Sequence, residues 1–160
     1  MKKNTAVYPG TFDPVTNGHL DIIERASGIF DKVIVTIALN SSKVPLFTKE
    51  ERKSMIKEVI NKYKNVEVDS FDGLLVNYAA KKKANTIIRG LRVLSDFEYE
   101  FQMSLTNRKL APDINTIFLM PNEKYAYLNS SLVKELAKFK GQIKSFVPEP
   151  VRKKLEEKFR

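Results

Sequence analysis

Short apolar runs alternate with longer amphipathic segments along the whole chain. The short runs are rich in β-branched residues and end at polar or turn-forming residues, which predicts strands at 5–8, 32–39, 66–69, 86–88 and 116–119. The intervening segments carry apolar residues at helical spacing and predict helices within 20–30, after Thr48, near 74–83, after Ser95, near 131–139 and at about 149–159. Thr48 with Glu51 and Ser95 with Glu98 have the spacing of capping boxes, so each pair is expected to begin a helix.

This alternation of strands and helices is typical of an α/β fold. Neighbouring parallel strands need crossover connections, and the helices in those connections cover both faces of the sheet. We therefore expect a single Rossmann-like domain, residues 1–160, with a doubly wound parallel five-stranded sheet. Ligands of such sheets bind beyond the carboxyl ends of the strands, where the loops 9–19, 40–47, 89–92 and 120–131 would open.

The composition agrees with one compact domain and limits the available chemistry. A chain of 160 residues with 42% hydrophobic content can bury a substantial core. It contains no cysteine, which excludes disulfides, thiolate nucleophiles and cysteine-ligated metals and fits a reducing compartment, so a cytoplasmic location is the default expectation. No apolar run approaches the ~18 residues of a membrane span, and the apolar stretch near the start is too short for a signal peptide.

The formal net charge of +9 raises the alternative of a basic nucleic-acid-binding module. Residues 134–160 hold nine Lys and Arg against four Glu, so this segment carries more than half of the net charge. Glu and Lys lie at short helical spacing there, which favours a solvated helical face with ion pairs. The sequence has no RNA-stacking signature and no helix-turn-helix pattern, so nucleic acid is not the expected partner.

The clearest chemical signature is the segment from Tyr8 to His19, YPGTFDPVTNGH, between the first predicted strand and the first predicted helix. Its glycines, Gly10 and Gly18, permit close backbone approach and unusual dihedral angles. A helix that begins near Gly18 would direct free N–H groups and its positive dipole end at an anion. Thr11 and His19, the only histidine, could donate hydrogen bonds to phosphate oxygens. The segment is neither a Walker A loop nor a GxGxxG turn, and it predicts a different kind of phosphate site.

Two further segments suit phosphate binding. Arg89 and Arg92 flank a glycine at the end of the fourth predicted strand, and a guanidinium binds phosphate bidentately at any working pH. Ser130 and Ser131 begin a predicted helix, whose N–H groups could face another phosphate. From the residues alone, a pair of surface arginines explains 89–92 equally well, and helix capping explains the two serines better than a phosphate site does.

Several motifs, in order along the chain, resemble one family. The TxGH within 16–19 is similar to the signature of the nucleotidyltransferase superfamily, whose members transfer a nucleotide monophosphate from a nucleoside triphosphate to a phosphate or similar acceptor. The strings YPGTFDP at 8–14, IRGLR at 88–92, DFEYE at 96–100 and SSLVK at 130–134 resemble, more specifically, the phosphopantetheine adenylyltransferases. The resemblance covers nearly the whole chain.

The resemblance implies an adenylyltransferase that moves AMP from ATP to 4′-phosphopantetheine and gives dephospho-coenzyme A and pyrophosphate, with Mg²⁺ held mainly by ATP and not by protein ligands. It implies His19 as the transition-state stabiliser. The implied ATP contacts are Thr11, Phe12, His19, Gly90, Leu91, Arg92, Glu100, Tyr125, Ala126, Tyr127, Leu128, Asn129, Ser130 and Ser131. The implied acceptor contacts are Thr11, Lys43, Leu75 and Arg89. It also implies a homohexamer and feedback binding of coenzyme A.

One segment departs from the family pattern, and the acceptor stays open. The family typically has three serines after an aromatic residue and an isoleucine, whereas Leu128-Asn129 replaces the first two members of that pattern here. Asn129 can still cap a helix and donate hydrogen bonds. Other acceptors within the superfamily are glycerol phosphate with CTP and nicotinamide mononucleotide with ATP. The TxGH loop does not separate them, and Lys43, Leu75 and 89–92 favour the pantetheine acceptor only through the resemblance.

Overall fold

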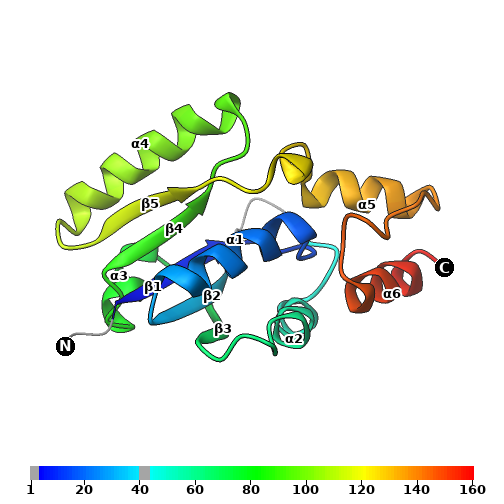
Figure 1. Ribbon diagram of the computed structural model, residues 1–160, viewed down its shortest axis with the longest axis horizontal. Helices are drawn as coiled ribbons and strands as arrows, with labels where there is room; N and C mark the ends of the chain where they lie inside the picture. Colours follow the sequence, from blue (N-terminus) through cyan, green and yellow to red (C-terminus); the bar gives the residue numbers. More distant parts are fainter. Residues whose placement is uncertain (1–3, 40–43) are drawn as a thin grey trace.

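The computed structural model describes residues 4–39 and 44–160, except for the side chains of Leu94 and Ser95. Strands and helices alternate over most of the chain (Figure 1). In order they are β1 (Thr5–Gly10), α1 (Asn17–Ile29), β2 (Lys32–Ala38), α2 (Lys49–Val59), β3 (Val66–Phe71), α3 (Leu75–Lys81), β4 (Thr86–Gly90), α4 (Leu94–Leu110), β5 (Asn115–Leu119), the 3₁₀ turn η1 (Glu123–Tyr125), α5 (Ser130–Lys138) and α6 (Glu149–Lys158).

All five strands are parallel and lie in the order β3-β2-β1-β4-β5. Successive side chains of a strand point to opposite faces of the sheet, and the core is divided in the same way. Val33 of β2 packs in one cluster with Ile23 of α1 and Ile56 of α2. Val7 of β1 packs in a second cluster with Val76 of α3. Helices therefore cover both faces, which confirms the predicted doubly wound, Rossmann-like fold.

The strand order reverses between β1 and β4, and the sheet opens at this point. The two strands pair only at Ala6 and Val7, although β1 continues to Gly10 beside β2. Pro9 lies beyond the last pair with β4, where its missing N–H interrupts no ladder hydrogen bond. This explains why a central strand tolerates a proline. In doubly wound sheets, ligands bind in the crevice at such a reversal.

The predicted elements agree with the structure except at some ends. The strands β1, β3 and β4 each run two residues further than predicted, to Gly10, Phe71 and Gly90. The capping box of Thr48 and Glu51 is confirmed, since Thr48 Oγ1 accepts from the Glu51 N–H at 3.1 Å and the Thr48 N–H donates to Glu51 Oε2 at 2.7 Å.

The second predicted capping box, of Ser95 with Glu98, is wrong. The helix α4 begins at Leu94, so Val93 occupies the N-cap position and no side chain caps the helix. The predicted N-cap, Ser95, lies two residues beyond the true one, because capping patterns locate the ends of helices less reliably than the helices themselves.

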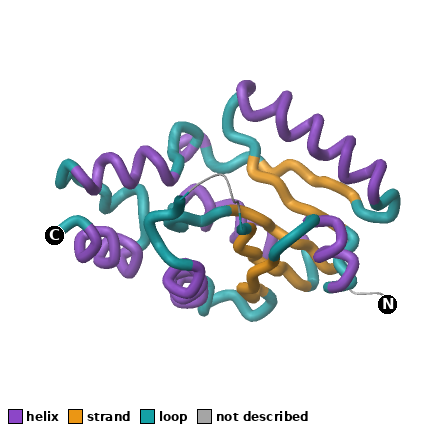
Figure 2. Tube along the Cα trace, turned by 180° about the vertical axis from the view of Figure 1, so that it is seen from behind, coloured by secondary structure: helices purple, strands orange, loops and turns teal. Residues whose placement is uncertain are grey.

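The helix α4 lies along the β5 edge, outside the rest of the fold (Figures 1 and 2). Its apolar residues Phe97, Phe101 and Leu105 have the four-residue spacing that predicted the helix, yet they are 42%, 47% and 49% exposed. The rings of Phe97 and Phe101 stack at a centroid distance of 5.5 Å. This apolar face is therefore not covered by the described part of the chain.

The helices α5 and α6 lie together at the end of the chain (Figure 1) and extend the core on the α2 side. Their basic side chains form ion pairs, as the charge pattern predicted. Arg152 pairs with Glu149 and Glu156, and Lys158 Nζ lies 3.1 Å from Glu51 Oε1 of α2. Within residues 4–39 and 44–160, no helix has the length and apolarity needed to cross a membrane.

Candidate active site

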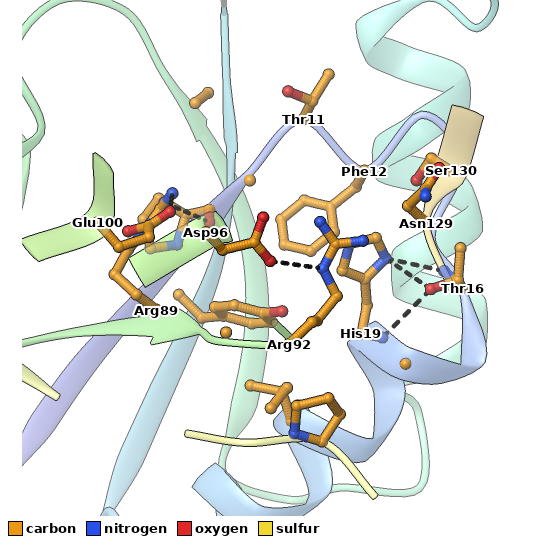
Figure 3. Close-up of a pocket in the computed structure, with 18 of the residues that line it drawn as sticks. Thr11, Phe12, Thr16, His19, Arg89, Arg92, Asp96, Glu100, Asn129 and Ser130 are labelled. Atoms are coloured by element: carbon orange, nitrogen blue, oxygen red, sulfur yellow. Dashed lines mark hydrogen bonds and ion pairs between the residues drawn. The ribbon is translucent and has the colours of Figure 1, made fainter. Parts of the chain in front are cut away.

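A cavity of about 820 Å³ opens where β1, β2, β3 and β4 end, at Gly10, Ala38, Phe71 and Gly90. Other parts of its wall come from the β1–α1 loop, from α4 and from the segment before α5 (Figure 3). Most residues named by the resemblance line it, namely Thr11, Phe12, His19, Leu75, Arg89, Gly90, Arg92, Glu100, Tyr125, Leu128, Asn129, Ser130 and Ser131. Leu91, Ala126 and Tyr127 lie outside its lining, and Lys43 is not among the described residues.

His19 lies in the first turn of α1, and Thr16 fixes its ring (Figure 3). The Thr16 N–H donates to His19 Nδ1 at 3.0 Å, and the His19 N–H donates to Thr16 Oγ1 at 3.4 Å. Because Nδ1 accepts a backbone N–H, the proton of the neutral imidazole is on Nε2. The Phe12 ring packs edge-on against the imidazole at a centroid distance of 5.0 Å. The ring is thus held with one N–H available to a ligand in the cavity.

The imidazole is neutral at physiological pH. Burial, and to a smaller extent the nearby positive charge of Arg92, together lower the pKa of His19 from 6.5 to about 4. A group with such a pKa holds no proton on Nδ1 at pH 7 and cannot serve as an imidazolium acid. His19 can therefore contribute a fixed, neutral hydrogen-bond donor and not a titrating one.

The two glycines of this loop do not adopt the positive φ that glycine permits. The positive φ falls on Phe12, at 49°, whereas neither Gly10 nor Gly18 has one. Gly10 instead makes room for a side chain, since a Cβ there would lie 2.9 Å from the Phe12 ring. Gly10 therefore contributes the close approach that glycine permits and not a positive φ, and it is required by packing beneath the site.

The start of α1 presents fewer free N–H groups than expected. The Asn17 N–H donates to the Phe146 carbonyl at 2.8 Å, and the His19 N–H is taken by Thr16. Intramolecular bonds thus satisfy two of the donors that were expected to face an anion. At this end of the cavity, side chains are therefore the main hydrogen-bond donors available to a ligand.

Arg89, near the end of β4, is held by two partners. Its Nε donates to Glu100 Oε2 at 2.7 Å and its Nη2 to Glu100 Oε1 at 2.5 Å. Its Nη1 donates to the Pro9 carbonyl at 3.3 Å, in the region where β1 and β4 have separated. Burial alone lowers the pKa of Arg89, but the hydrogen bonds and charge of Glu100 outweigh this and raise it above its ordinary value. Arg89 is therefore a permanent, oriented cation.

Arg92 lies three residues further on and faces His19 and Asp96 (Figure 3). Its Nε is 3.3 Å from Asp96 Oδ2, and its Nη1 donates to the Leu128 carbonyl at 3.0 Å. The bond to Leu128 ties the segment after β4 to the segment before α5, and both residues line the cavity. A second cation is thereby fixed beside the neutral imidazole.

The N-terminus of α5 forms another wall. Asn129 caps the helix, since its Oδ1 accepts the Leu132 N–H at 2.8 Å, as expected despite the departure from the serine pattern. Ser130 Oγ donates to the Pro14 carbonyl at 2.8 Å, which joins α5 to the β1–α1 loop. A helix N-terminus that lines a cavity favours an anionic ligand.

Comparison with known proteins identifies the family. The cytidylyltransferase-like family matches residues 7–136. The chain is similar to the phosphopantetheine adenylyltransferase of Caldanaerobacter subterraneus, with 59% identity over 97% of each chain, and to that of Alkaliphilus metalliredigens, with 57% identity over 95% of this chain and 97% of the relative. The chain belongs to the phosphopantetheine adenylyltransferase family. A solved structure of a provisionally named nicotinate-nucleotide adenylyltransferase from Vibrio parahaemolyticus shares the fold, with a TM-score of 0.70, 18% identity and coverage of 96% of this chain and 99% of that one.

The phosphopantetheine adenylyltransferase motif YPGTFDP contains an acid, Asp13, whose role the sequence did not reveal. Asp13 Oδ1 accepts the Phe47 N–H at 2.9 Å, and Oδ2 accepts both the Leu46 N–H at 2.9 Å and Lys134 Nζ of α5 at 2.8 Å. Burial raises the pKa of Asp13, but the bonds from Lys134 and the two N–H groups outweigh it and hold the pKa below 3.8. Asp13 therefore anchors the loop between β1 and α1.

Arg52 of α2 is a second anchor of this loop that sequence reasoning missed. It is only 3% exposed, and its Nη1 donates to the Thr11 carbonyl at 2.8 Å. The backbone around Thr11, Asp13 and Pro14 is thus held by α2, by the 46–47 backbone and by α5. No local spacing could have revealed this, because the partners lie 33 to 121 residues from the loop.

The resemblance implied Mg²⁺ held mainly by ATP and not by protein ligands, and this stays a prediction. Among residues 4–39 and 44–160, no cluster of three His, Cys, Asp or Glu side chains could hold a metal ion. The cavity carboxylates Asp96 and Glu100 each face an arginine. A cation that arrives with a polyphosphate would keep several waters and need few protein ligands.

Proposed function

We propose that this chain transfers the AMP group of ATP to 4′-phosphopantetheine, with dephospho-coenzyme A and pyrophosphate as products. The observation that carries the proposal is a single cavity, in a chain of this family, that contains a neutral histidine donor, two fixed arginines and a helix N-terminus. These groups suit two anionic substrates that must approach each other.

The proposed reaction is an in-line displacement at phosphorus. A phosphate oxygen of 4′-phosphopantetheine attacks the α-phosphorus of ATP, and the bond from that phosphorus to the oxygen bridging to the β-phosphorus breaks, so pyrophosphate leaves with the bonding electrons. No protein nucleophile is needed, and catalysis consists of positioning and charge stabilisation. His19 Nε2–H would donate to a phosphate oxygen as its charge grows, and Arg92 would face the same phosphates. Bound with ATP, Mg²⁺ would offset the charge of the phosphate oxygens.

The acceptor side is the part of the proposal with several alternatives. Leu75, Phe71 and Met103 give part of the cavity an apolar wall, which suits a pantetheine arm better than the small polar glycerol phosphate. The curated relatives are named phosphopantetheine adenylyltransferases, and this also favours the pantetheine acceptor. Nicotinamide mononucleotide remains the acceptor to test against it, since the solved structure that shares the fold is named for a related nucleotide.

The proposal is tested by pyrophosphate release in the presence of Mg²⁺ and ATP, with 4′-phosphopantetheine, nicotinamide mononucleotide, glycerol phosphate or no acceptor. We expect release only with 4′-phosphopantetheine, and no release once Mg²⁺ is chelated. Release with another acceptor would reassign the substrate. No release with any acceptor, together with gel shifts of nucleic acid at nanomolar protein, would replace the proposal with the basic-module alternative.

We further propose that the protein is a cytoplasmic homohexamer that coenzyme A inhibits by feedback. The exposed apolar face of α4, with Phe97, Phe101 and Leu105, supports an assembly because large apolar faces are usually covered by a partner. The lack of cysteine fits a reducing compartment. Light scattering measures the assembly, and addition of coenzyme A to the pyrophosphate assay measures the inhibition.

A further inference from the structure

The hydroxyl of Tyr8 lies where the strands β1 and β4 separate. Tyr8 is the first residue of β1 beyond the pairs with β4, which involve only Ala6 and Val7, and it lines the cavity. A Cβ on Gly90, at the end of β4, would lie 3.5 Å from Oη, the hydroxyl oxygen of Tyr8. Oη therefore lies beside the last residue of β4, at the end of the sheet where the cavity opens.

The ring that carries this hydroxyl is held in place by the core. Tyr8 is 5% exposed, and its ring packs edge-to-face against Phe12 at a centroid distance of 5.4 Å. Both rings belong to the core cluster that also contains Ile22 of α1. A tyrosine side chain has only two χ angles, so this packing fixes the position of Oη. A ligand that used the hydroxyl would therefore restrict the motion of this side chain very little.

The Tyr8 hydroxyl makes no hydrogen bond within residues 4–39 and 44–160, although a buried tyrosine O–H usually has a partner. It is also not sealed inside the protein. In that part of the chain, Asp96 Oδ2 is the only fully enclosed side-chain nitrogen or oxygen without a partner. Because Tyr8 lines the cavity, its unpaired oxygen is reached from there. A ligand that accepts this hydrogen bond would use a donor that the described part of the chain leaves unpaired.

The charges around Oη indicate the kind of ligand. Arg89 and Arg92 lie in the wall of the same cavity (Figure 3), and neither guanidinium can accept the hydroxyl proton. Burial raises the pKa of Tyr8 well above its ordinary value of 10 and outweighs the charges of Arg89 and Arg92, which lower it. The hydroxyl is therefore a neutral donor at every working pH. Its complement is an anionic oxygen that the two arginines also attract.

We infer that Tyr8 is a further substrate-binding residue, whose hydroxyl donates a hydrogen bond to the phosphate of the acceptor. The inference rests on the proposed function, in which Arg89 binds that phosphate. Arg89 is tied to the strand of Tyr8, since its Nη1 donates to the carbonyl of the next residue, Pro9, whereas Arg92 bonds to the Leu128 carbonyl before α5. The charge of Arg89 also acts on the Tyr8 hydroxyl more strongly than that of Arg92. Tyr8 keeps its proton during the displacement, so it orients the attacking phosphate and transfers no proton.

The inference predicts a defect confined to one substrate. Tyr8→Phe removes one oxygen and keeps the ring that packs against Phe12. We expect the KM for 4′-phosphopantetheine to rise by about tenfold or more, the scale for loss of a hydrogen bond to a charged group. The kcat should stay within about threefold, because the bond is present in both the ground state and the transition state, and the KM for ATP within about twofold. The melting temperature should not fall, because the hydroxyl has no partner to lose in the described part of the chain.

The test is steady-state kinetics with each substrate varied in turn, combined with calorimetric binding of 4′-phosphopantetheine. The ³¹P resonance of bound 4′-phosphopantetheine reports on the phosphate itself and should differ between wild type and Tyr8→Phe. Tyr63→Phe is the matched control, because it removes the same hydroxyl from a partly buried ring that packs against the core and does not line the cavity. The control should leave both KM values and the resonance unchanged.

The outcomes separate the inference from the function on which it rests. An unchanged acceptor KM, or an unchanged ³¹P resonance, in Tyr8→Phe would overturn the inference. A rise in the KM for ATP that equals or exceeds the rise for the acceptor would overturn it as well and assign the hydroxyl to ATP. A lower melting temperature with equal losses of affinity for both substrates would make Tyr8 a structural residue only. Absence of turnover by the wild-type chain with 4′-phosphopantetheine would instead refute the proposed function.

Discussion

Replacing Lys134 with methionine removes a partly buried ion pair between α5 and the loop that follows β1. Lys134 Nζ lies 2.8 Å from Asp13 Oδ2, and the Asp13 side chain is only 5% exposed. Methionine keeps most of the apolar stem of lysine without its charge. The substitution therefore tests the charge and hydrogen bond of Lys134 with little change in packing.

The size of the stability loss depends on the hydrogen bonds that Asp13 retains. Removing one partner of a fully buried pair costs about 3–5 kcal/mol, because the other charge stays buried and uncompensated. Here Asp13 retains the N–H donors of Leu46 and Phe47, and Lys134 is 29% exposed, so water reaches its end of the pair. We therefore expect the free energy of unfolding to fall by about 2–3 kcal/mol at pH 7.

The loss should depend on pH in a defined direction. In the wild-type protein the folded pKa of Asp13 lies below its ordinary value of 3.8, so its contribution is complete above that value and is lost as the pH falls through the folded pKa. Without Lys134, only the N–H groups of Leu46 and Phe47 oppose the effect of burial, which raises the pKa of Asp13. The pKa of Asp13 in the folded protein therefore moves upward. The stability difference between Lys134→Met and wild type should therefore shrink as the pH is lowered from 7 toward about 4.

Urea unfolding at pH 7 and at pH 4 measures both effects, at one protein concentration because assembly is linked to stability. Lys138→Met is the control, since Lys138 lies one turn further along α5 and is exposed. Its effect should be within about 0.5 kcal/mol at both pH values. A Lys134→Met deficit equal to that of the control, or one that grows on acidification, would refute the reasoning.

Three further predictions follow from the site, the loop and the surface. His19→Ala should lower kcat by about 10²–10³-fold while the calorimetric affinity for ATP stays within a few-fold, and wild-type kcat/KM, which reports the ligand-free enzyme, should show no titration of His19 between about pH 6 and 8. Gly10→Ala should lower the free energy of unfolding by about 1–3 kcal/mol because its Cβ meets the Phe12 ring, whereas Gly28→Ala, with open space around it, should be neutral or stabilising in thermal melts. Phe101→Asp should reduce the mass of the assembly in light scattering, with secondary structure by circular dichroism unchanged.

Much of this fold is determined by local patterns that a sequence displays directly. Runs of β-branched residues in β1 and β2 are buried on both faces, so they read as continuous apolar strands flanked by amphipathic helices. The end of β1 could not be located in this way, because Pro9 and Gly10 are typical turn residues. Their place in a strand depends on the divergence of β1 from β4, which is a tertiary feature.

The candidate site likewise contains residues that the sequence indicates and residues that it does not. His19, Arg89 and Arg92 could be found because each lies at or beyond the end of a predicted strand and carries a side chain suited to phosphate. The anchors Asp13, Lys134 and Arg52 could not, since each depends on a partner more than 30 residues away and has no distinctive spacing. The exposed face of α4 shows the converse, in that its helical spacing was clear from the sequence but its exposure was not.

Charge and positioning are assigned to different residues in this cavity. Arg89 and Arg92 supply permanent positive charge, while burial and the charge of Arg92 keep His19 neutral. A charged imidazolium beside Arg92 would be opposed by like-charge repulsion and desolvation, whereas a neutral Nε2–H is a donor at every working pH. The stabilisation that this donor gives the transition state then depends on its position, because a neutral hydrogen bond contributes little unless the donor is already oriented in the free protein. Thr16 orients the ring through its hydrogen bond to Nδ1, and Arg52 of α2 and Lys134 of α5 hold the loop on which Thr16 lies. The position of His19, which the sequence indicated, therefore depends on long-range contacts that the sequence did not indicate.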